Sequence, residues 1–275
     1  MKRVMGLIIS LFYLVFIKPF LFIFRSLSNE NSYYCIILFY HSVLDSEFRR
    51  FKKQMSLLSF LTEPTSIDIP DKLINGKRYS VITFDDAYQN VIENAAPELI
   101  RRKIPFTIFI PAGEIGKKPG WLANTGRNNE NEKVASLEEL RSLPASLVTL
   151  GSHTVHHPQL SLLSEEQAYK EIRESKDILE ALLERPIKYI AIPHGEHYQY
   201  IIDFCKRAGY EQVFTIKYES PFISANKYGR GRNNANPSDW YLEFILNILG
   251  AYDWLRAYSF LKGKIRGVLI RNSPQ

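Results

Sequence analysis

The chain has 275 residues, enough for a substantial core, and its 45% hydrophobic and 23% charged residues are ordinary for a globular protein. The formal net charge of +6 favours an anionic partner, but no stripe of lysine and arginine is interleaved with aromatic residues. We therefore expect no nucleic acid partner, and an anionic lipid or polymer fits the charge at least as well. The two cysteines, Cys35 and Cys205, are too few for a disulfide framework and leave the redox compartment undecided.

The chain begins with a strongly apolar segment. Residues 4–17 carry no charge, Lys18 and Pro19 interrupt the run, and residues 20–24 continue it. A membrane-spanning helix needs about 20 apolar residues, a length that is reached if Lys18 snorkels towards one interface. We interpret residues 1–28 as a membrane anchor or signal segment, favouring an uncleaved anchor, with a buried core helix as the third alternative. Positive charges on both sides leave its orientation undetermined.

From Tyr33 onwards, short apolar runs alternate with helical patterns. We expect strands at residues 35–40, 81–84, 104–111, 147–152, 188–193 and 212–216. We expect helices at residues 46–62, 90–102, 164–183 and 198–208, a short helix after Ser136, and a long loop at 112–135. Capping boxes mark two of the helix starts, Ser136 with Glu139 and Ser164 with Gln167. Repeated strand–helix units predict a mostly parallel sheet or barrel.

Acidic and histidine side chains follow four of these expected strands. His41 ends the first, Asp85 and Asp86 end the second, His153 ends the fourth, and the segment 193–197 follows the fifth. In parallel α/β folds, functional groups gather at the C-terminal ends of the strands. We therefore expect these side chains to meet at one edge of the sheet.

Two of the histidines suggest a metal site. His153 and His157 are four residues apart, which on a helical turn places both imidazoles on one face. Together with one aspartate oxygen they make a two-histidine, one-carboxylate set, which leaves positions open for water and substrate. We expect His156 to point elsewhere on the turn and His197 to be a solvated loop residue.

The sequence TFDD at residues 83–86 and the sequence HTVHHP at 153–158 resemble, in this order, motifs of the polysaccharide deacetylases of carbohydrate esterase family 4. The likeness covers about residues 35–216. It implies an α/β fold, a distorted (β/α) barrel with about seven strands, to which we add an N-terminal apolar helix and a C-terminal helical tail. The expected organisation is a membrane anchor or signal segment at 1–28, a catalytic domain at 33–235 and a helical basic tail at 236–275.

The resemblance also implies roles for single residues. Asp86, His153 and His157 should bind a divalent metal, and Asp85 should act as the general base that activates water. Zn²⁺ is the expected ion for these ligands, although Co²⁺, Mn²⁺ or Fe²⁺ would fit them too. The backbone N–H of His194 should help to hold the oxyanion.

The chain departs from the family pattern at two places. The third motif usually begins with arginine, but this chain has Ala191 there and resembles a branch without that arginine, so we expect Arg230 or Arg232 to orient Asp85. The histidine that usually serves as the general acid near the C-terminus is missing as well. His41 is therefore our first candidate for the general acid and His194 our second.

The tail at 236–275 combines apolar residues at helical spacing with a basic end, which would suit either an anionic bilayer or a helix packed on the barrel.

We expect a metal-dependent hydrolase that removes N-acetyl groups from amino sugars of a polysaccharide or a lipid-linked glycan. We expect it to be membrane-associated in a bacterial cell envelope, on a side that the sequence leaves open. The alternatives are a catalytically silent carbohydrate-binding barrel, a deformylase of a lipid-linked sugar, and an O-deacetylase.

Overall fold

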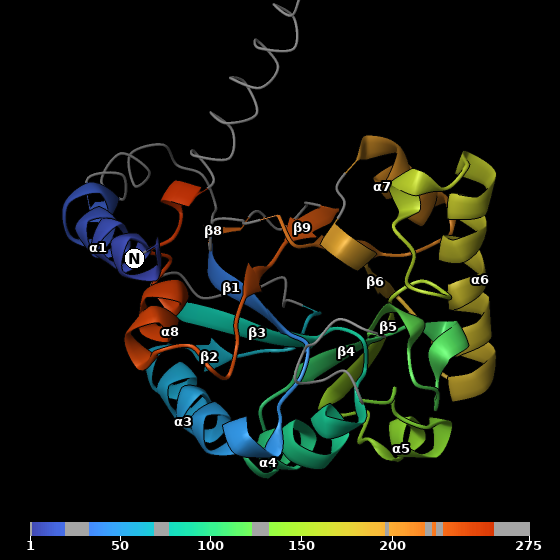
Figure 1. The fold of residues 1–275 in the computed structure, drawn as a ribbon, viewed down its shortest axis with the longest axis horizontal. Coiled ribbons are helices and arrows are strands. Elements are labelled where there is room, and N and C mark those ends of the chain that lie inside the picture. Colours follow the sequence, from blue (N-terminus) through green and yellow to red (C-terminus); the bar gives the residue numbers. More distant parts are fainter. Residues whose placement is uncertain are drawn as a thin grey trace, which may run out of the picture.

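The computed structural model describes residues 2–19, 33–68, 77–122, 132–195, 198–217, 222–223 and 228–255. A parallel sheet curves into a barrel, with helices around its outside (Figure 1). The order along the sheet is β10-β1-β3-β4-β5-β6-β7-β9, while β2 adds to β3 and β8 pairs antiparallel with β1. The strands are β1 (Tyr33–Tyr40), β2 (Glu63–Pro64), β3 (Arg78–Phe84), β4 (Phe106–Ile110), β5 (Val148–Ser152), β6 (Tyr189–Ala191), β7 (Gln212–Thr215), β8 (Phe222–Ile223), β9 (Gly229–Gly231) and β10 (Asn233–Asn234). The predicted (β/α) barrel is confirmed.

A single short segment closes the barrel. β9 pairs in parallel with β7, and β10 pairs in parallel with β1 at the other edge of the sheet. Only Arg232 separates these two strands, so residues 229–234 bridge both edges. The Arg232 N–H donates to the Thr215 carbonyl at 3.0 Å, and the Ala235 N–H donates to the Phe39 carbonyl at 3.0 Å. Four strands were not predicted from the sequence, namely β2, β8, β9 and β10, and each has only two or three residues.

The helices cover the outer face of the barrel (Figure 1). They are α3 (Asp45–Leu61), α4 (Ala96–Arg101), α5 (Leu137–Ser142), α6 (Glu165–Leu183), α7 (Gln199–Arg207) and α8 (Tyr241–Ile248). The predicted helix at 90–102 begins as a π-helix, Val91–Ala95, and only then continues as α4. Both predicted capping boxes are present, with Ser136 accepting from the Glu139 N–H and Ser164 from the Gln167 N–H.

Two layers of side chains alternate along each strand. The outward residues, such as Leu38, Phe84 and Ile108, join the helices in the larger core cluster. The inward residues form a second cluster that includes Val81, Phe109 and Phe214. Because side chains alternate between the two faces of a strand, these inward residues fill the interior of the barrel.

The N-terminal segment forms helix α1 (Lys2–Phe12), followed by a π-helix at Tyr13–Ile17. Leu7 packs against Leu246 and Ala251, so α1 lies beside α8 (Figure 1). In the described parts of the chain, no helix combines the length and the apolar character needed to cross a bilayer. Residues 20–28 of the expected anchor, and the basic residues of the expected tail beyond position 255, lie outside the described residues.

Candidate metal centre and active site

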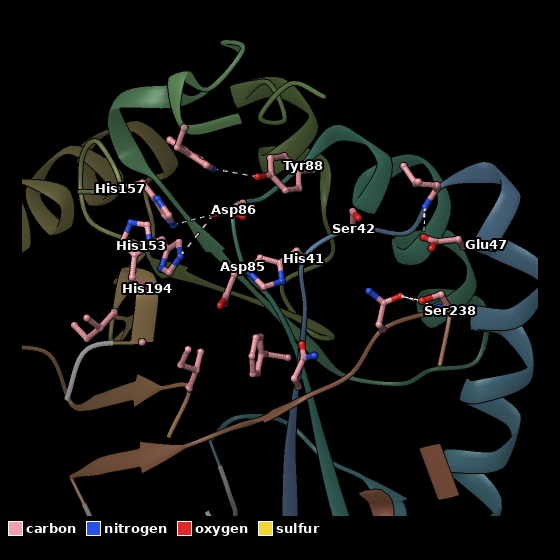
Figure 2. A pocket seen from close by; sticks show the side chains of 18 residues that line it. His41, Ser42, Glu47, Asp85, Asp86, Tyr88, His153, His157, His194 and Ser238 are labelled. Atoms are coloured by element: carbon pink, nitrogen blue, oxygen red, sulfur yellow. Dashed lines mark hydrogen bonds and ion pairs between the residues drawn. The ribbon is translucent and has the colours of Figure 1, made fainter. Parts of the chain in front are cut away.

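Asp86, His153 and His157 converge at the C-terminal edge of the sheet (Figure 2). The Asp86 Oδ1 atom is 3.7 Å from Nε2 of His153 and 3.3 Å from Nε2 of His157. With zinc–ligand bonds of about 2.0–2.1 Å, two neighbouring atoms of a tetrahedral set lie about 3.3 Å apart. Asp86 Oδ1 is buried and has no hydrogen-bond partner among the described residues, a costly arrangement that a cation would relieve. The three side chains therefore fit a divalent metal ion.

Hydrogen bonding and burial keep the two imidazoles ready to bind metal. Nδ1 of His153 lies 2.7 Å from the Ala191 carbonyl, which can only accept, so Nδ1 carries the proton and Nε2 is free. Burial lowers the pKa of His153 below its ordinary value. Burial, together with the neighbouring His153 and His194, lowers the pKa of His157 to about 2. Both side chains are thus neutral at physiological pH, the form that metal binding requires.

The turn that carries the two histidines is not helical, which corrects the expected helical turn. Thr154 and His157 have positive φ values of 66° and 57°, and the turn is fastened from outside by Glu171 of α6. One carboxylate oxygen of Glu171 accepts from the backbone N–H groups of Val155 and His156, each at 3.0 Å. The other oxygen lies 2.7 Å from Nδ1 of His156. His156 therefore points away from the site, as expected, and helps to fix the backbone from which His157 projects.

Asp85 is held by an arginine from the segment that closes the barrel. Nη1 of Arg232 donates to Oδ1 of Asp85 at 2.6 Å, and Nη2 donates to Oδ2 at 2.8 Å. Of the two arginines considered from the sequence, Arg232 makes this contact. Burial would raise the pKa of Asp85, but the charge of Arg232, with a smaller contribution from His153, lowers it to about 2. Asp85 is therefore ionised at neutral pH, the state that a general base needs.

The Arg232 guanidinium is itself buried inside the barrel. It lies 4.9 Å from the ring centre of Phe39 and 5.2 Å from that of Phe109, and its Nη1 also donates to the Thr83 hydroxyl at 3.0 Å. Aromatic faces attract a cation and tolerate a flat guanidinium between them. The aromatic rings and the salt bridge together fix the orientation of Asp85.

The two carboxylates diverge because the backbone turns sharply between strand and helix. Asp86 and Ala87 have positive φ values of 67° and 51°, which are rare for residues other than glycine. The Ala87 carbonyl accepts from the Ala135 N–H at 2.8 Å, and the Asp85 N–H donates to the Tyr40 carbonyl at 2.9 Å. Strained backbone of this kind is characteristic of functional sites. Here it aims Asp85 at Arg232 and Asp86 at the histidines.

A cavity of about 650 Å³ opens above these residues, and both candidate general acids line it. Figure 2 shows His41 on one side of Asp85 and His153, His157 and His194 on the other. The ring centre of His194 is 4.8 Å from that of His157. The candidate residues therefore share one pocket, while their catalytic roles stay predictions. His197 lies outside the described residues.

Both candidate acids sit on backbone that the fold constrains. The loop after His41 is tied to the π-helix, since the Val43 N–H donates to the Asn90 side chain at 2.9 Å. His194 has a φ of 57°, and Gly195 follows with a φ of 69°. A Cβ atom at Gly195 would lie 1.7 Å from a side-chain carbon of Ile216, so only glycine fits there.

Trp121 lines the pocket but was not predicted from the sequence. Its ring stacks on that of His157, with centres 4.3 Å apart, and its Nε1 donates to the Tyr88 hydroxyl at 3.1 Å. It comes from the long loop at 112–135, where no motif marked it. Three further lining residues, Glu47, Asn236 and Ser238, were also not predicted.

Comparison with known proteins places this site in a family. Residues 72–213 match the family model described as polysaccharide deacetylase. The protein YxkH of Bacillus subtilis is 22% identical over 157 residues, which are 57% of this chain and about half (51%) of YxkH. The poly-beta-1,6-N-acetyl-D-glucosamine N-deacetylase of Staphylococcus aureus is 27% identical over 222 residues, which are 78% of this chain and 71% of that protein.

Solved structures share the fold. IcaB from Ammonifex degensii has a TM-score of 0.67 and 22% identity, and the match covers 78% of this chain and 97% of IcaB. The Streptococcus pyogenes deacetylase PplD has a TM-score of 0.64 and 20% identity, and the match covers 80% of this chain and 99% of PplD.

Proposed function

This chain belongs to the polysaccharide deacetylase family, and on that basis we propose that it is a metal-dependent hydrolase that removes N-acetyl groups from amino sugars of a polysaccharide. The observation that carries the proposal is the convergence of Asp86, His153 and His157 beside an ionised Asp85. The reaction adds water across an amide, so that the C–N bond breaks and the products are acetate and a free sugar amine.

Zn²⁺ is our first choice for the ion at Asp86, His153 and His157, and Co²⁺, Mn²⁺ or Fe²⁺ suit the same donors. When bound, such an ion supplies Lewis acidity towards a carbonyl oxygen and lowers the pKa of a water molecule.

The chain itself supplies the proton transfers. Asp85 accepts the proton of the attacking water, because Arg232 keeps its carboxylate charged and fixed in direction. His41 donates a proton to the departing amine, and His194 is the second candidate for this role. We further propose that the backbone N–H of His194 donates to the developing oxyanion.

The substrate that we propose first is a polymer of β-1,6-linked N-acetylglucosamine. The supporting observation is the 27% identity with the Staphylococcus aureus protein whose name states that substrate. A lipid-linked glycan with the same acetamido sugar is our second proposal, since the cavity of about 650 Å³ would accept the sugar in either form.

Acetate release from N-acetylated oligosaccharides tests the activity. The wild-type protein loaded with Zn²⁺ should release acetate, and Asp85→Asn should be slower by about 10²- to 10⁴-fold. A catalytically silent carbohydrate-binding barrel would bind the oligosaccharide and release nothing. Mass spectrometry of the products separates a deformylase, because loss of formyl differs in mass from loss of acetyl. An oligosaccharide that carries O-acetyl groups but no N-acetyl groups tests for an O-deacetylase.

We also propose that the protein works at a membrane of a bacterial cell envelope. The support is an exposed apolar surface on α1 and the π-helix that follows it, where Val4, Ile8, Phe12 and Phe16 are 47–65% exposed. Apolar helix faces of this kind, next to basic residues, suit the interface of an anionic bilayer. Phe12→Asp combined with Phe16→Asp should abolish co-flotation with anionic vesicles, whereas Phe60→Asp, at an exposed phenylalanine of α3, should not. Equal flotation of both variants would contradict this proposal.

A further inference from the structure

The lining of the pocket is acidic although the whole chain is basic. The chain has 35 lysines and arginines against 29 acidic residues. The pocket lining nevertheless contains three carboxylates, those of Glu47, Asp85 and Asp86, and its described residues include no lysine or arginine. Arg232 engages Asp85 from inside the barrel, and Asp86 belongs to the metal set. Glu47 is the pocket carboxylate that the proposed chemistry does not use.

Glu47 has no cationic partner in the described part of the chain. It lies in the first turn of α3, and no described lysine or arginine comes within 4.0 Å of its carboxylate. Its one hydrogen bond to the described residues is a weak one, from the Leu44 N–H at 3.4 Å. In Figure 2, Glu47 and Ser238 lie at one end of the pocket, and His157 and His194 lie at the other.

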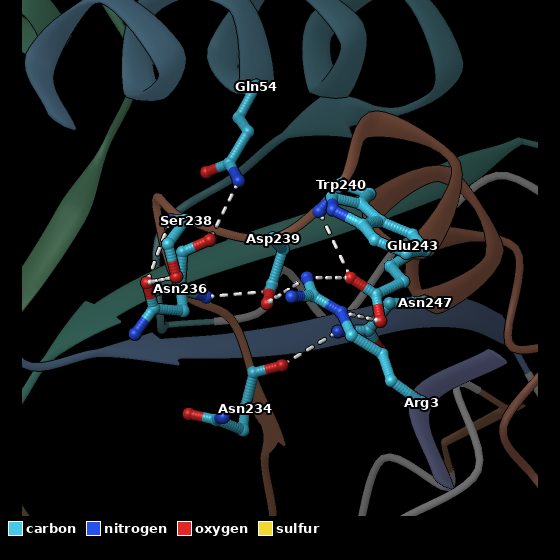
Figure 3. Close-up of polar contacts among 9 residues, drawn as sticks. All are labelled: Arg3, Gln54, Asn234, Asn236, Ser238, Asp239, Trp240, Glu243 and Asn247. Carbon is cyan, nitrogen blue, oxygen red and sulfur yellow. Dashed lines mark hydrogen bonds and ion pairs between the residues drawn. The ribbon is translucent and has the colours of Figure 1, made fainter. Parts of the chain in front are cut away.

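The wall around Glu47 is polar and is held in place by the chain. The Asn236 N–H donates to Asp239 at 2.8 Å, and the Asn236 carbonyl accepts from Gln54 at 2.8 Å (Figure 3). The Asn236 side chain accepts from the Ser238 hydroxyl at 2.7 Å. Arg3 of α1 pairs with Glu243 and lies 4.0 Å from Asp239, so α1 braces the loop from outside. The loop that carries Asn236 and Ser238 is thus held in position by hydrogen bonds within the protein, without a ligand.

We infer that Glu47 forms a subsite for the free amine of a sugar unit that has already been deacetylated. This sugar unit and the unit being hydrolysed belong to the same polysaccharide molecule. The inference rests on the proposed function and specifies its substrate. Deacetylation turns a neutral acetamide into a basic amine, which becomes a positively charged ammonium group when it takes up a proton. A carboxylate without a cationic partner forms a charge-assisted hydrogen bond with that ammonium group, but has no comparable attraction for an acetamide. The protein would then prefer chains that are already partly deacetylated.

The test compares two N-acetylglucosamine oligomers, one fully acetylated and one with a single free amine beside an acetylated unit. For the wild-type protein, kcat/KM should be about tenfold higher for the oligomer with the amine. Glu47→Gln should bring the ratio close to one, because glutamine keeps the helix-capping geometry and loses the charge. The matched control is Glu139→Gln, the same change at the same helix position in α5, and it should leave the ratio unchanged.

Two results would overturn the inference. One is a ratio near one in the wild-type protein. The other is a Glu47→Gln variant that slows both oligomers equally, which would mean that Glu47 binds a hydroxyl group. Calorimetric titration of the wild-type and Glu47→Gln proteins with a fully deacetylated oligomer decides the question without turnover. If no oligomer releases acetate, the proposed function fails, and the loss of amine binding in Glu47→Gln still decides the subsite.

Discussion

The guanidinium of Arg232 donates hydrogen bonds to both carboxylate oxygens of Asp85, at 2.6 and 2.8 Å. The two residues are 147 positions apart in the sequence. Arg232 is also the residue between β9 and β10, the two strands that pair with opposite edges of the sheet. The orientation of the proposed base therefore depends on the closure of the barrel. Arg232 thus takes the place of the arginine that usually begins the third motif of the family, where this chain has Ala191.

Substitution of Arg232 should change the pH dependence of the reaction. In the wild-type protein the pKa of Asp85 is about 2, so Asp85 stays ionised at neutral and mildly acidic pH. In Arg232→Met, burial remains and the compensating charge is lost, so the pKa of Asp85 should rise above its ordinary value. The acidic limb of the kcat/KM profile should then move to higher pH.

Arg232→Lys tests the geometry separately from the charge. Lysine keeps the positive charge but cannot bind both oxygens at once, so kcat should fall about 10- to 100-fold. The zinc content, measured by elemental analysis, should stay at the wild-type level. Loss of zinc would show instead that Arg232 supports the metal site.

Glu171 should control metal affinity without touching the metal. Because its carboxylate fixes the backbone N–H groups of Val155 and His156, Glu171→Ala should loosen the turn that carries His157. We expect zinc affinity to fall about tenfold. Competition with a fluorescent chelator measures this, and Glu174→Ala, at an exposed position of the same helix, serves as the control. An unchanged affinity in Glu171→Ala would contradict the prediction.

The metal should stabilise the folded protein through Asp86. Asp86 Oδ1 is buried without a described partner, so an ion that binds there favours the native state. At a free zinc concentration of about 100 times Kd, the gain is about 2.7 kcal/mol. A chelator should therefore lower the melting temperature of the wild-type protein clearly, and that of Asp86→Asn hardly at all. An equal shift in both proteins would place the stabilising ion elsewhere.

The metal-free protein should lose stability in mild acid. The folded-state pKa of His157 is about 2, whereas an unfolded histidine has a pKa of about 6.5. Below about pH 6.5, His157 takes up a proton in the unfolded chain but stays neutral in the folded chain. The free energy of unfolding therefore falls as the pH falls. Between pH 7.5 and 5.5, His157 alone should cost about 1 kcal/mol. Urea unfolding of the wild-type protein and His157→Gln, both with chelator, measures the difference, and equal pH slopes would refute it.

The sequence predicted the position of site residues best where acidic or histidine residues follow directly after a regular strand. Asp86, His153 and His157 each stand in a motif at or just after a regular strand, so the order of the strands was enough to bring them together. The strands at 35–40 and 81–84 were placed within three residues of β1 and β3 for the same reason, since apolar runs fix their position.

The residues that the sequence left open come from irregular backbone. β9 and β10 read Gly-Arg-Gly and Asn-Asn, which have low strand propensity, so their pairing depends on the edges of a sheet that is already formed. Sequence alone could name Arg230 and Arg232 as candidates but could not choose between them. Trp121 and Glu47 reach the pocket from a loop and from the first turn of a helix, and their direction depends on tertiary packing.

The segment at residues 229–234 also links the charge state of Asp85 to the completeness of the barrel. A chain that extends only as far as β7 contains Asp86, His153 and His157, but it lacks the guanidinium that lowers the pKa of Asp85. In a chain that ends before Arg232, the Asp85 carboxylate would lack this guanidinium, and the edges of β7 and β1 would lack the strands that pair with them here.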